Sequence, residues 1–275
     1  MRFARYDDGR GSRIGVAAEG GIVATEFETL DELIAAGHRG LAEAETAREH
    51  GEPVDPGQLL VPLRPRQVIC CGINYESHLE ENPGAKVPDQ PFLFAKLPSS
   101  VIGPGEPIVI PAPESEVDYE VELTVVVGAT MRNVSREDAL GCVFGYTIVN
   151  DVSGRDIQFV DQQITLGKSI DSFCPVGPVV TAAKGFDPGS VRLTTHVNGE
   201  QRQDDSTGSQ FFDVATLLAF VSSYITLEPG DLVTTGTPAG VGAFRDPPAY
   251  LRPGDVVTVA AEGIGELTNP VVAGW

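Results

Sequence analysis

Short apolar runs that end at glycine or proline constrain this fold more than any other feature of the sequence. The 275 residues include 31 glycines and 21 prolines, which recur with no fixed period. This distribution predicts many turns, and it excludes a collagen-like chain and a bundle of long helices. The strands and helices read from the sequence also do not alternate as repeated βαβ units. We therefore expect a β-rich α+β fold with scattered helices.

The predicted strands are short, and most of them follow residue 60. The clearest covers residues 117–127, and further strands are predicted at 68–72, 92–95, 108–110, 144–150, 177–181, 191–197, 232–235 and 256–260. Asn198-Gly199 is a strong hairpin signal directly after the strand at 191–197. Helices are predicted at 135–142, which opens with a Ser-x-x-Asp capping pattern, and at 214–225, which is apolar enough to be mostly buried.

Residues 1–60 are predicted to form a small N-terminal α/β domain, followed by a catalytic domain at 61–275. Strands are expected at 1–6, 13–18 and 22–25. Thr29 and Glu32 fit a capping box for a first helix that Gly37 can end, and a polar second helix follows at 41–49. Four prolines between residues 53 and 65 indicate a linker. We interpret the N-terminal segment as a structural appendage.

The charge of the chain excludes several classes of partner. Asp and Glu number 39 against 19 Lys and Arg, so the formal net charge is −20. Such a surface repels nucleic acid and anionic lipid, and we expect neither a nucleic-acid nor a membrane partner. An anionic substrate would need a metal ion or local cations to bind here.

The sequence predicts a soluble cytoplasmic protein. The first residues lack the apolar stretch of a signal peptide, and no apolar run approaches the roughly 20 residues of a membrane-spanning helix. The cysteines at 70, 71, 142 and 174 form no C-x-x-C pair. We interpret them as reduced residues packed in the core.

Two carboxylates on one strand and a third at the end of another indicate a metal site. In a strand, alternate residues share a face, so Glu120 and Glu122 would point the same way, about 7 Å apart. Asp151 follows a second apolar strand. Paired oxygen ligands suit Mg²⁺, Mn²⁺ or Ca²⁺, and the lack of a neighbouring histidine disfavours zinc and two-histidine iron sites. The alternatives are an exposed acidic face for the glutamates and an ordinary Asn-Asp turn.

His78 is the candidate general base. If residues 76–81 are helical, His78 and Glu81 share a face, and the carboxylate would orient the imidazole and raise its basicity. The same spacing is common on solvated helices, which is the alternative interpretation.

Three further features could bind an anion. Lys168 could balance an acidic metal site or hold an anionic substrate. Arg155 and Gln158, within one helical turn, could contact a substrate carboxylate. The glycine-rich loop 234–242, with its hydroxyls and free amides, could bind an anion or form only a tight turn.

The order of the motifs closely resembles the fumarylacetoacetate hydrolase family. They are C-G-I-N-Y-x-x-H, P-F-L-F-A-K, D-Y-E-V-E-L-x-V-V-V-G, G-Y-T-I-V-N-D-V-S-x-R-D-I-Q, G-K-S-I-D-S-F-C-P-V-G-P, V-N-G-E and L-E-P-G-D-L-V-T-T-G-T-P-A-G-V-G. The match runs from about residue 67 to 272. The resemblance implies a roll of mixed β-sheets, usually in a homodimer, preceded by the small N-terminal domain of many bacterial members.

The resemblance also implies roles for the motif residues. Its metal ligands for Mg²⁺ or Mn²⁺, less often Ca²⁺, fall on Glu120, Glu122 and Asp151, and its water-activating pair falls on His78 and Glu81, with Glu80 adjacent. The family lysine falls on Lys168. The positions near the substrate are Arg155, Gln158 and Thr237, and residues 80–90 match a mobile lid.

These matches imply a divalent-metal-dependent hydrolase that cleaves a C–C bond in a 1,3-diketo, acylpyruvate-like acid. The 2-oxo acid would chelate the ion, and His78 would activate water. The metal would stabilise the pyruvate enolate that leaves, with Lys168 neutralising charge. The metal would also explain how an acidic protein acts on an anionic substrate.

Two other functions stay open. The first is an oxaloacetate-like 2-oxo acid decarboxylase or a 2-hydroxy-diene-dioate isomerase or tautomerase, which needs the same ion but no attacking water. The second is a non-catalytic, metal-stabilised partner protein. The nearest rival fold, an iron-dependent cupin oxygenase, would need histidine ligands that do not accompany these acids.

Overall fold

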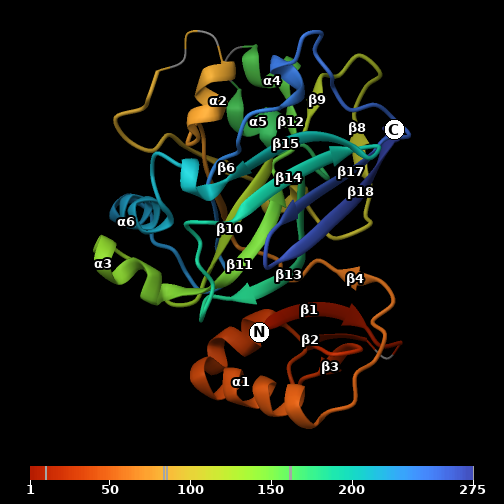
Figure 1. Cartoon of the computed structure of the whole chain (residues 1–275), viewed down its shortest axis with the longest axis vertical. Helices are drawn as coiled ribbons and strands as arrows, with labels where there is room; N and C mark the ends of the chain where they lie inside the picture. The colour runs from red at the N-terminus through yellow and green to blue at the C-terminus, as the bar shows by residue number, and fades with distance from the viewer. Residues whose placement is uncertain (10, 83, 85, 161–162, 275) are drawn as a thin grey trace.

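A small layer of strands with one helix lies beside a larger β-rich body (Figure 1). The computed structural model describes residues 1–9, 11–82, 84, 86–160 and 163–274. Within these ranges strands predominate, helices are few, and both parallel and antiparallel pairs occur. The predicted β-rich α+β fold with mixed sheets is therefore confirmed.

One large sheet contains eleven of the described strands. Its main path runs through β3 (Gly21–Ala24), β2 (Ser12–Ala18), β1 (Arg2–Asp7), β13 (Cys174–Ala182), β11 (Val143–Asn150), β10 (Val121–Val127), β16 (Leu232–Thr234), β5 (Val68–Cys71) and β6 (Leu93–Lys96). Off this path, β4 (Leu59–Leu60) pairs with β1, and β7 (Val101–Ile102) pairs with β13. Since β7 follows β6 after one 3₁₀ turn at Pro98–Ser100, this pairing brings the end of the sheet back towards its middle. The sheet therefore curls into a roll.

The larger body also contains a second sheet. Its strands, in order, are β15 (Glu200–Ser206), β14 (Arg192–Val197), β17 (Val256–Ala261), β18 (Gly265–Ala273) and β8 (Ile108–Ile110). The predicted hairpin joins β14 to β15, with Asn198 and Gly199 both at positive φ. Both β15 and β18 were missing from the predicted strands. β15 is almost wholly polar and β18 contains a proline, so neither has the apolar alternation of a strand.

The prediction of one continuous strand at 117–127 is wrong. The segment forms β9 (Val117–Asp118), which pairs with β12 (Ser153–Gly154), and then β10 after a two-residue break. Side chains take the place of strand partners at the break, because the amide of Tyr119 donates to Asp118 Oδ1 and that of Glu120 donates to Asn150 Oδ1. This break sets Glu120 at the head of β10.

The helices are short except for the first. They are α1 (Leu30–His50), α2 (Glu76–Glu81), α3 (Arg136–Ala139), α4 (Arg155–Phe159), α5 (Ile164–Lys168) and α6 (Val214–Tyr224), with 3₁₀ turns at Leu140–Cys142, Thr207–Ser209 and Gly242–Phe244. The capping box of Thr29 and Glu32 is confirmed. The two predicted N-terminal helices are one element interrupted by a non-helical Gly37, at φ 57°. Of the helices described, none is long and apolar enough to cross a membrane.

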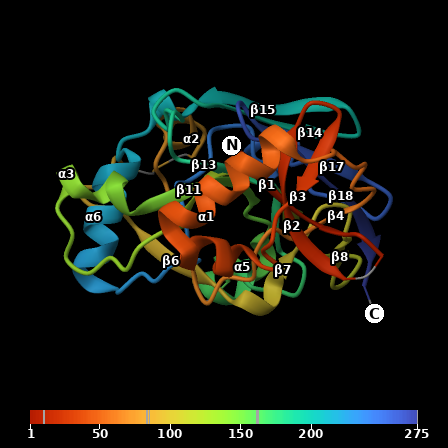
Figure 2. The ribbon, with the colours of Figure 1, turned by 90° about the horizontal axis from the view of Figure 1, so that it is seen from below.

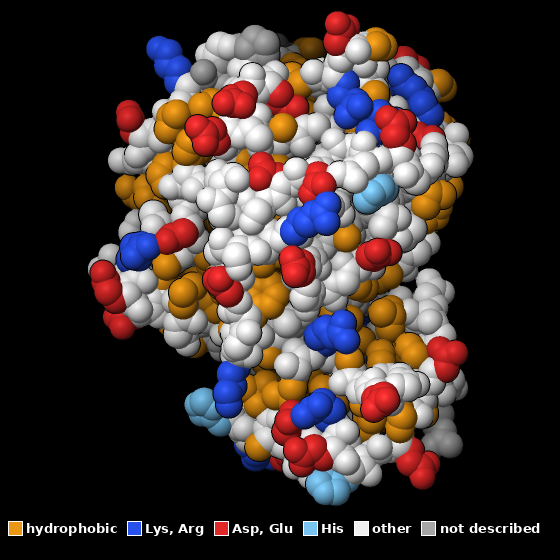
Figure 3. Space-filling view, in the orientation of Figure 1, with side chains coloured by type: hydrophobic (Ala, Val, Ile, Leu, Met, Phe, Trp, Pro, Cys, Tyr) orange, Lys and Arg blue, Asp and Glu red, His pale blue; other side chains and the backbone are white. Residues whose placement is uncertain are grey.

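The N-terminal layer is joined to the larger body by backbone pairing and by a shared core. β1 pairs with β13, so the large sheet continues through both parts. One cluster of buried side chains contains Phe3 and Leu33 together with Val126 and Val180. α1 packs on β2 and β3 and crosses the molecule when seen from below (Figure 2). Hydrophobic side chains are also visible where the two parts meet (Figure 3). A domain boundary at residue 60 stays a prediction.

Candidate active site

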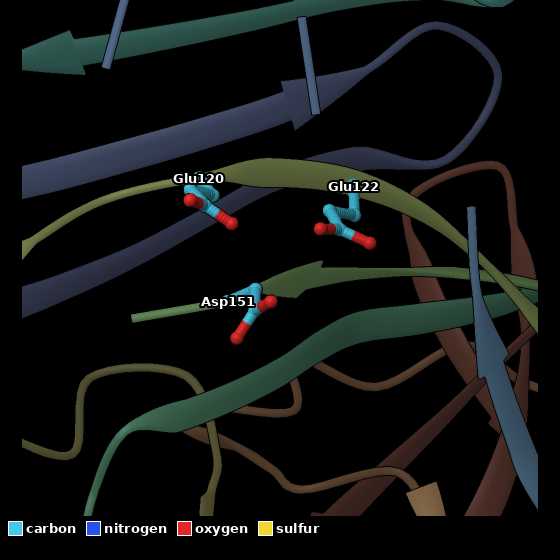
Figure 4. A group of neighbouring side chains, drawn as sticks. All are labelled: Glu120, Glu122 and Asp151. Carbon is cyan, nitrogen blue, oxygen red and sulfur yellow. The ribbon is translucent and has the colours of Figure 1, made fainter. Parts of the chain in front are cut away.

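Three buried carboxylates lie together in the larger body. Glu120 directly precedes β10, Glu122 belongs to it, and Asp151 directly follows the neighbouring strand β11. One carboxylate oxygen from each residue lies within 4.8 Å of the others (Figure 4). The three residues are between 0% and 5% exposed, so the interpretation of the two glutamates as an exposed acidic face is wrong. We call Glu120, Glu122 and Asp151 the acidic triad.

Three buried cations contact two members of the triad. Lys168 Nζ, at the end of α5, lies 2.7 Å from Glu120 Oε2 and 2.8 Å from Asp151 Oδ2. Arg155, at the start of α4, donates to Glu120 Oε1 at 2.6 Å and to Asp118 Oδ2 at 3.0 Å. Lys96 Nζ, at the end of β6, lies 2.6 Å from Asp151 Oδ1. These pairs leave Glu122 without an ion pair among the described side chains.

These different surroundings shift the pKa values of the two glutamates in opposite directions. Burial raises the pKa of Glu120, but the charges of Lys168 and Arg155 outweigh it and lower this pKa to about 2. Burial, with the charges of Asp151 and Glu120, raises the pKa of Glu122 well above its usual range. Burial lowers the pKa of Lys168, but Asp151 and Glu120 raise it to about 12, so the lysine stays charged.

The triad fits a hard divalent cation. Its ligand atoms are all carboxylate oxygens, which Mg²⁺ and Mn²⁺ prefer. Glu122 Oε2 accepts the amide hydrogen of Gly236 at 2.9 Å, which compensates a buried negative charge only in part. A cation bound at the triad would supply the missing positive charge. The triad contains neither the cysteine nor the histidine ligands that zinc and softer metals prefer.

His78 and Glu81 form a pair on α2. The predicted helix is confirmed, and His78 Nδ1 lies 2.6 Å from Glu81 Oε1. The other oxygen of Glu81 accepts the amide hydrogen of Gly240 at 2.8 Å. His78 is only 8% exposed, so the solvated-helix interpretation is wrong. An ionised Glu81 accepts a hydrogen from Nδ1, which leaves Nε2 as the free proton acceptor.

A cavity of about 240 Å³ brings most of the predicted residues together. It is lined by His78, Glu120, Glu122, Arg155, Gln158, Lys168 and Thr237 from the predicted set, and by Phe92, Phe94, Phe159, Ile164 and Phe244 among apolar side chains. From residues 80–90, matched to a lid, Asn82, Lys86 and Pro88 also line it, and positions 83 and 85 lie outside the described residues. The lining therefore combines charged and polar side chains with aromatic ones.

The predicted substrate-binding residues have partners within the protein. Arg155 Nη1 donates to Gln158 Oε1 at 2.9 Å, in addition to its carboxylate contacts. The Thr237 hydroxyl donates to the Val121 carbonyl and accepts from Gln203, each at 2.9 Å. Their contact with a substrate stays a prediction.

The interpretation of loop 234–242 as an anion site with free amides is wrong for at least five of its amides, because those of Thr235 and Ala239 donate to the Leu123 carbonyl and to Ser77 Oγ. The amides of Gly236, Gly240 and Gly242 donate to Glu122, Glu81 and Asp118 respectively. The loop therefore orients the protein's own carboxylates, one of them in the triad and one beside His78.

The sequence did not assign three buried residues of the site. Lys96 contacts Asp151, and Asp118 links Arg155 to the loop amides of Gly242 and Ala243. Gln203 accepts the amide hydrogen of Val121, between the two glutamates. A lysine at the end of an apolar strand was the one available signal, and Asp118 and Gln203 carry none that separates them from surface residues.

Comparisons with known proteins agree with the motifs. The family model described as Fumarylacetoacetate (FAA) hydrolase C-terminal matches residues 67–272. Oxaloacetate tautomerase fahd2, mitochondrial, of Xenopus laevis is 38% identical over 290 residues, which cover 99% of this chain and 90% of that protein.

Solved structures show the same similarity. Fumarylacetoacetate hydrolase from Exiguobacterium antarcticum superposes with a TM-score of 0.90 at 42% identity, with 99% of each chain covered. Maleylpyruvate hydrolase from Sphingobium sp. SYK-6, in complex with manganese (II) ion and pyruvate, superposes with a TM-score of 0.83 at 30% identity, with 100% of each chain covered. From its motifs, its fold and these matches, the chain belongs to the fumarylacetoacetate hydrolase family.

Proposed function

We propose that this chain is a divalent-metal-dependent enzyme of small 2-oxo acids, in which His78 transfers a proton beside a cation held by the acidic triad. The observation that carries the proposal is that His78, which is held by Glu81, lines the same cavity as the two glutamates of the triad. When bound, Mg²⁺ or Mn²⁺ would polarise the keto group and compensate negative charge that develops on its oxygen.

His78 is placed for general-base catalysis. Glu81 holds its Nδ1, so Nε2 accepts the proton, and the carboxylate stabilises the resulting imidazolium. Lys168 keeps its positive charge beside the triad and favours an anionic substrate. The aromatic side chains of the cavity exclude water from the rest of the substrate.

Hydrolysis of an acylpyruvate is our first candidate reaction. His78 would take a proton from water, and the hydroxide would add to the distal carbonyl. The C–C bond would then break to release a carboxylic acid and a pyruvate enolate, whose carbon would receive the proton back from His78 to give pyruvate. The His78–Glu81 pair supports this reaction because a positioned base is what attack by water requires. The similarity to a maleylpyruvate hydrolase supports it as well.

Oxaloacetate tautomerisation is the second candidate, favoured by a relative of that name that covers 99% of the chain. Here His78 would take a proton from the carbon beside the keto group, and the enol oxygen would gain a proton. Decarboxylation or isomerisation of a related acid would likewise use the triad without attacking water.

One assay separates these reactions. Metal-stripped protein is mixed with acetylpyruvate or with enol oxaloacetate, before and after Mg²⁺ or Mn²⁺ is added, and the enol absorbance and pyruvate are followed. Metal-dependent loss of acetylpyruvate with equimolar acetate and pyruvate would indicate hydrolysis. A faster enol–keto change in oxaloacetate without pyruvate would indicate tautomerisation, and pyruvate with CO₂ would indicate decarboxylation. No metal-dependent change in either substrate would contradict the proposal.

The role of His78 as the general base is tested with a single substitution. His78→Gln removes the proton acceptor and leaves the triad intact, so turnover should fall by about 10²–10⁴-fold while Mn²⁺ still binds. A wild-type rate in this variant would exclude His78 as the base.

A cytoplasmic location and a homodimer are also proposals. The vertebrate relative carries the word mitochondrial in its name, which describes that protein. Light scattering during size-exclusion chromatography should give twice the chain mass of 29.1 kDa, and a single-chain mass would contradict the homodimer.

A further inference from the structure

Lys96 is a buried cation that the proposed reaction does not use. It ends β6 and is 1% exposed, and its Nζ donates to Asp151 Oδ1 at 2.6 Å and to the Val152 carbonyl at 3.0 Å. The Val152 carbonyl gives the ammonium a second fixed partner beside the carboxylate. The lysine is therefore held in one place by backbone and side chain together.

Lys96 and Lys168 contact different oxygens of the same carboxylate. Lys168 takes Asp151 Oδ2, also contacts Glu120, and lines the cavity. Lys96 takes Oδ1, and it is not among the described residues that line the cavity. Lys168 is therefore placed to meet a substrate, whereas Lys96 touches the triad only at Asp151.

We propose that Lys96 is a positioning residue that holds Asp151 for cation binding. By occupying Oδ1, it fixes the rotation of the carboxylate and directs Oδ2 towards the side of the triad where Glu120 and Lys168 lie. This inference rests on the proposed cation site at the acidic triad.

Two effects of Lys96 on cation affinity have opposite signs. Its positive charge repels a divalent cation, whereas its hydrogen bond orders a ligand. We expect the ordering effect to be larger, because Asp151 is fully buried and its other side-chain partner is Lys168, which it shares with Glu120. Replacing a residue that orients a metal ligand in this way typically weakens metal binding by about 10–100-fold.

The test is isothermal titration of the metal-stripped full-length protein with Mn²⁺. Lys96→Met keeps the length and apolar volume of the side chain but removes its donor, and it should weaken Mn²⁺ binding by about 10–100-fold. Unchanged or tighter binding in this variant would overturn the proposal. If the wild-type protein itself binds no Mn²⁺, the cation site fails, which is a different result from a failure of Lys96.

A second pair of variants separates positioning from a purely structural role. Lys96→Met leaves Asp151 with one buried partner fewer, which could prevent folding, whereas Asp151→Asn combined with Lys96→Met removes both charges of the pair. If Lys96 acts through Asp151, the double variant should bind Mn²⁺ as Asp151→Asn alone does, within about 2-fold. A further loss of 10-fold or more in the double variant would show that Lys96 acts elsewhere.

Discussion

The two glutamates of the triad have the same side chain but different surroundings. Glu120 is flanked by Lys168 and Arg155, whereas Glu122 meets a backbone amide and two other carboxylates. In the metal-free protein the pKa of Glu120 is therefore lowered and that of Glu122 is raised, which favours a proton on Glu122. A cation at the triad must displace that proton before Glu122 can act as a ligand.

The raised pKa of Glu122 predicts how stability depends on pH. A glutamate in the unfolded chain has a pKa of about 4.3, so between that value and the raised folded value the folded state binds more protons. The contribution of Glu122 to the stability of the metal-free protein is therefore fully present below this window and is lost as the pH rises through it. Urea unfolding at a series of pH values should show this fall, and saturating Mn²⁺ should reduce it.

Glu122→Gln is the control for that prediction. The amide is neutral at every pH, so the fall in stability over this window should disappear, and the Mn²⁺-induced stabilisation should be lost with it. A pH profile identical to that of the wild-type protein would show that another group causes the effect.

Loop 234–242 has a function that its glycines only partly indicated. Its sequence predicts a turn, but the partners of its amides come from the α2 helix and from β9 and β10, which are distant in the sequence. Gly240 has a φ of 106°, and a Cβ there would lie 2.0 Å from the Arg202 carbonyl oxygen. Only glycine therefore allows its amide to reach Glu81.

Gly240→Ala should separate turnover from metal binding. The loop must shift to accommodate the methyl group, so Glu81 loses a hydrogen bond and His78 is oriented less well. We expect turnover to fall by roughly 10-fold or more, because the rate gained from a general base depends on its orientation. The affinity for Mn²⁺ should stay within a few-fold of that of the wild-type protein. Gly141→Ala, where a Cβ would meet no atom within 4 Å, is the matched control and should leave turnover unchanged. Equal turnover in both variants would contradict this function of the loop.

Sequence patterns predicted the elements that bury an apolar face and missed those held by polar contacts. The Thr29 cap, the 198–199 hairpin and the α2 helix follow from local rules. The break before Glu120 depends on Asn150, which lies 30 residues away, so no local pattern could reveal it. The sequence indicated the triad because carboxylates are unusual within or at the end of apolar strands, whereas the roles of Asp118 and Gln203 depend on contacts that only folding creates.

The whole molecule is held together by pairings between distant segments. β1 pairs with β13, and β7 returns to β13 from the opposite end of the large sheet. Neither pairing has a signature in the sequence, because many strands of similar composition could serve as partners. The four prolines after the N-terminal segment predict a small separate domain, and in the structure its sheet and one core cluster continue into the rest of the chain.

Phe3→Ala tests whether the two parts unfold together. Phe3 is 1% exposed on β1 and packs against the Phe144 ring on β11, with the ring centroids 5.6 Å apart. Its removal should cost about 3–5 kcal/mol of unfolding free energy. Because the cluster spans both parts, calorimetry should show one transition that moves as a whole. Two transitions, with only one of them shifted, would instead support an independent N-terminal domain.

Oxalate resembles the enolate of pyruvate but cannot react, so its binding probes the proposed 2-oxo acid site without turnover. Isothermal titration of the wild-type protein with oxalate, with and without saturating Mn²⁺, measures whether the triad and its cation together create the 2-oxo acid site. We predict one oxalate bound per chain in the presence of Mn²⁺ and at least 100-fold weaker binding in its absence. Oxalate affinity that is the same with and without Mn²⁺ would contradict a metal-dependent 2-oxo acid site.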